Sequence, residues 1–155
     1  MYYVTPDVQA LVQGAIAPKG AAGALLASWE RRETALVLCE EIVAEYEAVL
    51  SRPHIANKFA YISPATISAS AAALREQSIF VTVKEVPRVV PNDPDDDVVL
   101  ACAVVGHAEY IVSRDNHLLK MGAYQGIPII SAESLARILR GQVSEPLELV
   151  YGRPR

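Results

Sequence analysis

Short apolar runs alternate along this chain with longer segments in which apolar residues recur every three or four positions. The runs are rich in β-branched and aromatic residues, which is typical of buried strands, and the periodic segments are typical of amphipathic helices. We expect strands at 2–5, 35–39, 79–83, 109–113 and 127–130. We expect helices at 8–16, 22–31, 40–51, 54–59, 63–77 and 94–105, and a last one from 131 or 132 to 140.

This alternation predicts an α/β fold. Successive parallel strands need a crossover connection, usually a helix, and the helices then cover both faces of the sheet. We therefore expect three α/β/α layers around a central parallel sheet of about five strands. A chain of 155 residues suits one domain. We place that domain at 1–141 and expect 142–155 to form a tail that packs on the domain or on a partner subunit.

Composition narrows the class of protein. Apolar residues make up 52% of the chain and charged residues 21%, which favours a globular domain over a disordered one. The longest apolar stretches, about ten residues, are too short to span a bilayer, and the N-terminus lacks a signal pattern. Cys39 and Cys102 each stand alone in apolar surroundings. We expect a cytoplasmic protein with two reduced core cysteines and no membrane association.

The net charge of −4 argues against a protein that holds nucleic acid by bulk electrostatic attraction. It does not exclude a nuclease whose acids are gathered at a metal site, because the bound metal cancels much of that local charge. Charge alone therefore decides little about function.

The most unusual segment is the acidic run Pro91-Asn-Asp-Pro-Asp-Asp-Asp97, which leads directly into an apolar helix. Asp93 suits the N-cap and Pro94 the first helical position, so the helix begins here. A helix start uses one or two acids, and the others need a further partner, for which a divalent cation is the obvious choice. We interpret Asp95 and Asp96 as solvated first-turn acids and assign the further role to Asp97.

Three more acids are expected at the same edge of the sheet. Asp7 follows the first strand, Asp115 follows the fourth, and Glu45 lies on the buried side of the helix after the second. Ligands bind outside the carboxyl ends of parallel strands, so these acids and Asp97 converge. Simpler roles stay open: Asp7 and Asp115 as N-caps, the latter of a helix at 116–121, and Glu45 as a surface glutamate.

Such a cluster is unstable without a cation: either some of the acids are protonated or the site binds a metal ion. Two carboxylates ~4 Å apart repel each other by roughly 4 kcal/mol at an effective dielectric near 20. Oxygen ligands of this kind favour Mg²⁺ or Mn²⁺. A metal held in this way lowers the pKa of a bound water and stabilises charge on a phosphodiester under attack.

These residues resemble the PIN-domain family, in particular the VapC-type toxins and their PilT-N-terminus-like relatives. The resemblance runs from about Tyr2 to Leu135 and is carried by 93–115, by Ala44-Glu-Tyr46 with Val49-Leu-Ser-Arg-Pro53, and by Tyr124-Gln-Gly-Ile-Pro-Ile-Ile130. It implies a ribonuclease dependent on Mg²⁺ or Mn²⁺, often dimeric and often silenced by an antitoxin. Carried over by position, the metal-binding acids fall on Asp7, Glu45, Asp97 and Asp115.

Four further residues are candidates for substrate binding. Ser113 matches the family's usual hydroxyl after the fourth strand, where it holds a carboxylate or a phosphate. The other three are Arg52, Arg114 and His117, which are placed to contact RNA. Solvated surface positions are the simpler interpretation of these three side chains, although His117 is also a candidate metal ligand. For Ser113 the alternative is a plain serine at the end of a strand.

The chain departs from the family pattern at two places. The family usually opens with Asp-Thr-Asn, where this chain has Asp7-Val8-Gln9, preceded by a proline. It often has a second aspartate two residues after the fourth acid, where this chain has His117. These departures bear on metal affinity and catalytic rate more than on the fold.

We therefore expect a metal-dependent endoribonuclease, the toxin of a toxin–antitoxin pair, that acts on RNA and forms a homodimer. The main alternative is a PIN scaffold with a weakened site that binds RNA or a protein partner. A third hypothesis is a phosphoacceptor domain with Asp7 as nucleophile. Such domains need a lysine at the end of the fifth strand, and residues 127–131 contain none.

Overall fold

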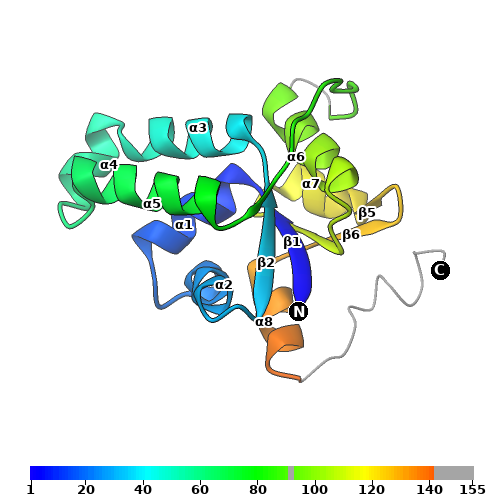
Figure 1. Cartoon of the computed structure of the whole chain (residues 1–155), viewed down its shortest axis with the longest axis horizontal. Helices are drawn as coiled ribbons and strands as arrows, with labels where there is room; N and C mark the ends of the chain where they lie inside the picture. The colour runs from blue at the N-terminus through cyan, green and yellow to red at the C-terminus, as the bar shows by residue number, and fades with distance from the viewer. Residues whose placement is uncertain (91–92, 142–155) are drawn as a thin grey trace.

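The computed structural model describes residues 1–90 and 93–141, which form a mostly parallel sheet flanked by helices (Figure 1). Six strands lie in the order β3-β2-β1-β4-β6-β5. They are β1 (Tyr2–Pro6), β2 (Thr34–Leu38), β3 (Ile79–Phe80), β4 (Tyr110–Val112), β5 (Ala123–Tyr124) and β6 (Ile127–Ile130). All neighbouring strands are parallel except β5 and β6. The predicted α/β class is confirmed.

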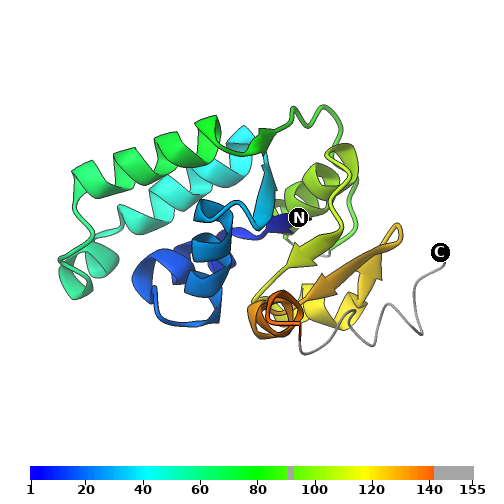
Figure 2. The same cartoon turned by 60° about the horizontal axis from the view of Figure 1, so that its bottom comes forward.

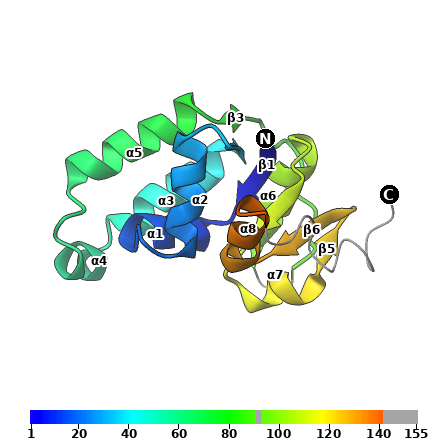
Figure 3. The same ribbon diagram turned by 90° about the horizontal axis from the view of Figure 1, so that it is seen from below.

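The helices lie on both sides of β1 and β2, with α1 to α5 on one side and α6 on the other (Figure 1). They are α1 (Val8–Ile16), α2 (Ala21–Glu30), α3 (Glu40–Leu50), α4 (Pro53–Lys58), α5 (Pro64–Glu76), α6 (Pro94–Val105), α7 (Asn116–Met121) and α8 (Ala132–Leu139). Helices α2 and α8 lie side by side below the sheet (Figure 3). The predicted helix bounds agree with these to within a residue or two.

Two details of the sheet differ from the expected sheet of about five strands. The third strand is only two residues long, and its residues Ile79 and Phe80 are 38% and 40% exposed at the edge of the sheet. The sheet has six strands because residues 123–130 form a hairpin, β5–β6, at the end of the molecule away from α4 and α5 (Figure 2). Its two turn residues, Gln125 and Gly126, both have positive φ, as a two-residue hairpin turn requires.

The order of the strands places a crevice at the carboxyl ends of β1 and β4. The chain leaves β1 toward β2 and later returns to add β4 on the opposite side, so these strands form the switch point where open α/β sheets bind ligands. Pro6 is accommodated in β1 without the loss of a hydrogen bond between strands. Alternate residues of a strand face opposite neighbours, and the N–H that Pro6 lacks would face β2, whose paired register with β1 ends at Val4 and Leu36.

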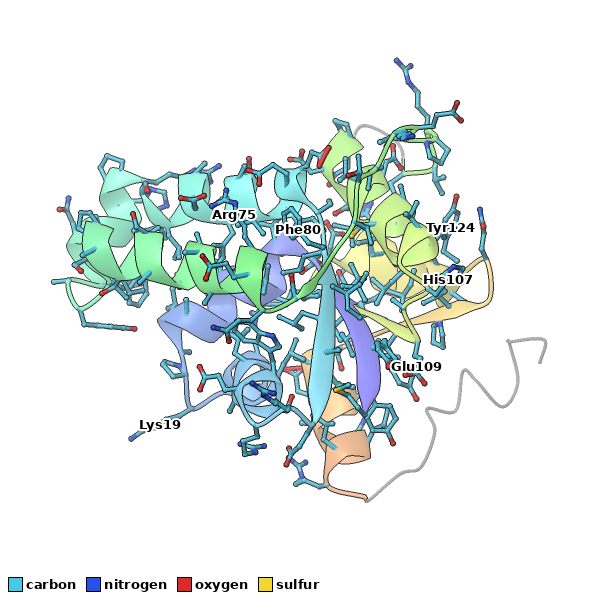
Figure 4. All side chains as sticks on the ribbon, in the orientation of Figure 1. Lys19, Arg75, Phe80, His107, Glu109 and Tyr124 are labelled. Carbon is cyan, nitrogen blue, oxygen red and sulfur yellow. The ribbon has the colours of Figure 1, made fainter. Side chains whose placement is uncertain are left out.

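The core is formed by apolar side chains from the sheet and from the helices on both sides. The largest fully buried ones include Leu11, Leu36, Leu38, Ile42, Leu100, Ile111 and Ile129. Cys39 and Cys102 are buried and free, as predicted. On the outer surface Arg75 of α5 lies over α3 and bonds Glu40 and Glu47, which ties these two helices together (Figure 4).

Two further expectations concern the C-terminal tail and membrane-spanning helices. The predicted tail at 142–155 lies outside the described residues, as do Pro91 and Asn92. In the described part of the chain no single helix is long and apolar enough to cross a membrane. Only α1 and α2 taken together, bent by 91°, meet that test of length and composition.

The close packing of α1 on α2 yields a prediction about stability. A Cβ added at Gly23 would collide with the backbone carbonyl of Pro18, whereas one added at Gly20 meets nothing closer than the carbonyl oxygen of Ala17 at 3.4 Å. We expect Gly23→Ala to lower the free energy of unfolding by about 1–3 kcal/mol, the usual cost of overpacking. Gly20→Ala, at the N-cap of α2, is the comparison: it meets no backbone clash and should cost less, up to about 1 kcal/mol, because alanine caps a helix less well than glycine. Urea denaturation measures both, and equal effects would contradict the packing described.

Candidate metal centre

Asp7 connects the ends of the two central strands. Its backbone N–H donates to the carbonyl oxygen of Val112 on β4 at 2.8 Å. Its Oδ1 accepts from the N–H of Ala10 at 2.7 Å and so caps α1. Its Oδ2 accepts from Ser113 Oγ at 2.5 Å and from the N–H of Arg114 at 3.2 Å. Asp7 is therefore both the N-cap and a member of the site, and its carboxylate is held in one orientation.

Burial is the main influence on Asp7 and raises its pKa above the ordinary value. The hydrogen bonds from Ser113, Ala10 and Arg114 act in the opposite direction because they stabilise the charged form, while the charge of Asp115 raises the pKa further.

The segment after β4 is organised around Ser113. Its hydroxyl accepts from the N–H of Asp115 at 2.9 Å while it donates to Asp7. Asp115 Oδ1 in turn accepts from the N–H of His117 at 2.7 Å and caps α7. Of the two roles expected for Ser113, holding a carboxylate or holding a phosphate, the structure shows the first. One buried hydroxyl thus fixes the spacing of Asp7 and Asp115.

The start of α6 supplies two more acids. Asp93 is the N-cap, and its Oδ1 accepts from the N–H of Asp96 at 3.3 Å. Asp96 is only 7% exposed, and its Oδ2 is buried with no hydrogen-bond partner among the described residues. Burial, together with the neighbouring carboxylate of Asp93, raises the pKa of Asp96 to about 8. The interpretation of Asp96 as a solvated first-turn acid was wrong.

Asp93, Asp96 and Asp115 form a compact cluster, in which one carboxylate oxygen from each lies within 4.8 Å of the others. At that separation two full charges repel by ~3.5 kcal/mol at an effective dielectric near 20. Oxygens on opposite sides of a Mg²⁺ ion lie about 4.2 Å apart, twice the bond length, so the cluster needs only a small adjustment to bind one. The orphaned Oδ2 of Asp96 and the all-oxygen donor set both fit a divalent cation.

Asp97 lies elsewhere. Its Oδ1 accepts from the backbone N–H groups of Val89 and Val90, at 2.9 and 2.7 Å, so it fastens the segment that leads into α6. Adjacent helical residues point about 100° apart, and the structure brings Asp96 into the position that the sequence assigned to Asp97. The spacing of a capping box, in which the third residue after the N-cap faces back over it, is the signal that identifies Asp96.

Glu45 reaches the same region from α3, as predicted, but stands apart from the compact cluster. Its Oε1 lies 3.5 Å from the guanidinium of Arg52, and these side chains are 37% and 53% exposed. An exposed pair of this kind contributes at most about 1 kcal/mol. Glu45 therefore remains available to a cation.

A cleft of about 370 Å³ opens above these acids. Its lining includes Asp7, Glu45, Asp93, Asp95 and Asp96, together with Arg52 and Arg114. The candidates Arg52 and Arg114 thus face the cleft, whereas His117 is exposed on α7 and is not among the lining residues.

Comparison with known proteins agrees with this geometry. The sequence matches the PIN domain over residues 4–117. The chain belongs to the PIN-domain family. Members of this family are typically metal-dependent nucleases, and the matched range contains every acid described above. No curated protein matches the chain.

Adjacent acids of this PIN domain give a matched test of metal binding. With Mn²⁺ at 100 times its Kd, the wild type should gain about 2.7 kcal/mol of stability. Asp96→Asn should lose most of that gain because it removes a metal-binding carboxylate. Asp97→Asn should keep it, since the amide oxygen still accepts from Val89 and Val90. Thermal unfolding with and without Mn²⁺ measures both, and the reverse ranking would restore Asp97 as the ligand.

The raised pKa of Asp96 predicts a pH dependence. The group binds its proton more tightly in the folded state, at a pKa of about 8, than in the unfolded state, near 3.8. Without metal, its contribution to stability is present at low pH and is lost as the pH rises from about 4 to about 8. Denaturation in EDTA should therefore show that the free energy of unfolding of Asp96→Asn rises relative to that of the wild type as the pH increases across this range. If the stabilities of the two proteins changed with pH in parallel, the raised pKa would not belong to Asp96.

Proposed function

We propose that this PIN domain is an endoribonuclease that uses Mg²⁺ or Mn²⁺ to hydrolyse RNA phosphodiester bonds. The observation that carries the proposal is the buried, unpartnered Oδ2 of Asp96 beside two further carboxylates within 4.8 Å. A buried carboxylate oxygen without a donor is costly unless a cation completes it. The cation would also offset the negative charge of the cleft, which otherwise repels an RNA phosphate.

Each side chain has a part in this mechanism. Asp93, Asp96 and Asp115 would hold the ion, and Asp7 adds an oxygen whose direction is set by Ala10, Ser113 and Arg114. A bound Mg²⁺ or Mn²⁺ supplies a water of lowered pKa and positive charge beside the phosphate.

The remaining polar groups of the cleft act on the substrate. Arg114 offers a guanidinium to a phosphate oxygen of the RNA. Glu45, at the other side of the cleft, extends the set of carboxylates and orients the attacking water. In-line attack of that water would leave a 5′-phosphate and a 3′-hydroxyl.

The biological setting is proposed from the family resemblance. A toxin of a toxin–antitoxin pair in the cytoplasm, acting as a homodimer and silenced by a cognate antitoxin, is the setting that the VapC-type resemblance supports. Co-expression with the gene product encoded beside it, followed by co-purification, tests the antitoxin.

Cleavage of a 5′-labelled single-stranded RNA tests the activity. We expect hydrolysis that requires Mn²⁺ or Mg²⁺, stops in EDTA, and falls on the order of 100-fold in Asp96→Asn because one ligand of the metal is gone. Glu45→Gln should reduce it as well, and Asp97→Asn should stay within a few-fold of the wild type. Product ends are identified by their response to phosphatase and ligase.

The alternative function, a scaffold that binds RNA or protein without cutting, is favoured by the departure from the family opening at Asp7-Val8-Gln9. The same assay separates the two functions. RNA binding without any metal-dependent cleavage would support the scaffold and contradict the nuclease.

A further inference from the structure

The side chains that line the cleft are acidic in one part and neutral or basic in another. All of its carboxylates come from positions 7, 45, 93, 95 and 96, next to the carboxyl edge of the sheet. Helices α1 and α3 begin at that edge, after β1 and β2, and contact each other. Both contribute residues to the lining of the cleft. Apart from Asp7 and Glu45, the side chains on and beside these helices that line the cleft carry no negative charge. They are Val8, Gln9, Val12 and Gln13 on α1, and Val49 and Arg52 on and after α3.

The α1 wall presents two glutamine amides side by side. Gln9 and Gln13 are four residues apart and so share one face of the helix, with Val12 between them. Neither amide is hydrogen-bonded to any of the described residues. Each carries one acceptor and two donors, which is the set that recognises the edge of a nucleobase.

The opposite wall supplies a cation and an apolar surface. Arg52 is about two turns beyond Glu45, and among the described residues its guanidinium is held only by that 3.5 Å contact. Val49 lies between them on the same face of α3 and lines the same cleft as Val12. The cleft therefore offers a cation, two apolar side chains and a pair of amides, which are the groups that contact the phosphate, the face and the edge of one nucleotide.

The size of the cleft limits its occupant. About 370 Å³ is near the lower end of the range of roughly 300 to 1,000 Å³ for small-molecule sites. A cleft of this size suits a single unpaired nucleotide better than a base pair. Sequence-specific proteins read RNA in this way, through bases splayed out of the strand.

We propose that Gln9 and Gln13, with Arg52 opposite, form a subsite that reads the base of one unpaired nucleotide beside the scissile phosphate. The two glutamines thereby set the base preference of cleavage, and Arg52 holds the neighbouring phosphate without regard to sequence. This inference rests on the proposed ribonuclease function and adds to it the residues that determine specificity.

The test compares the cleavage rates of three labelled decaribonucleotides, A10, C10 and U10. The wild type with Mn²⁺ should cut them at unequal rates, and the double variant Gln9→Ala/Gln13→Ala should lower the ratio of fastest to slowest at least fivefold. The stabilisation by Mn²⁺ should not change, which shows that the metal centre is intact. Gln77→Ala, an exposed glutamine at the end of α5, is the control.

Arg52 is tested with the same substrates. Arg52→Gln should raise KM for all three by a similar factor, because phosphate contacts carry no sequence information. Arg31→Gln is its matched control, since Arg31 is an exposed arginine paired with Glu33 away from the cleft. A loss of base preference in Arg52→Gln alone would contradict the assigned roles.

The outcomes distinguish this inference from the proposed function. Unequal cleavage that is unchanged in the glutamine variant, or equal cleavage by the wild type, overturns the subsite and leaves the nuclease intact. If the wild type cuts none of the three RNAs, the proposed nuclease function is wrong. Binding of the same RNAs in EDTA then tests the subsite by itself. Weaker and less selective binding by the glutamine variant supports the subsite, and unchanged binding overturns it.

Discussion

Repulsion among carboxylates at the carboxyl ends of β1 and β4 is the constraint on which the rest of the site depends. Like charges within 4.8 Å destabilise the fold unless a proton or a cation neutralises them. Asp7, Asp93 and Asp115 lessen the cost by accepting backbone hydrogen bonds at helix starts. Asp96 has no such donor for Oδ2 among the described residues, so its carboxyl group is the one that most needs a proton or a cation.

A small number of hydrogen bonds fix the positions of these acidic side chains. The ladder between β1 and β4 brings Asp7 and Ser113 together, and Ser113 then bonds both Asp7 and Asp115. On the other side Asp97 fastens the segment before α6, which sets the position of the helix start that carries Asp96. An acid with two backbone donors thus positions its neighbour, which has none. This division of roles between adjacent residues explains why both are buried.

The sequence predicted the regular parts of this arrangement well. Helix bounds followed from periodicity and capping residues, and Asp7, Glu45 and Asp115 lie at the predicted edge. The hairpin of β5 and β6 was missed because its turn, Gln125-Gly126, lacks the usual asparagine or aspartate before glycine. Asp97 was assigned the role of Asp96 because apolar neighbours mark a buried face but do not say what covers it. The cover proved to be backbone N–H groups.

The departure from the family opening at Asp7-Val8-Gln9 has a physical consequence of its own. Val8 brings no hydroxyl to Asp7, yet Ser113 Oγ and the N–H groups of Ala10 and Arg114 already hold both carboxylate oxygens. The first acid therefore keeps its orientation without help from positions 8 and 9. Gln9 is thereby released from supporting the metal centre, and its longer amide lies in the cleft beside Gln13. The residue that weakens the resemblance at this motif is thus one of the two that, in our proposal, contact a base from α1.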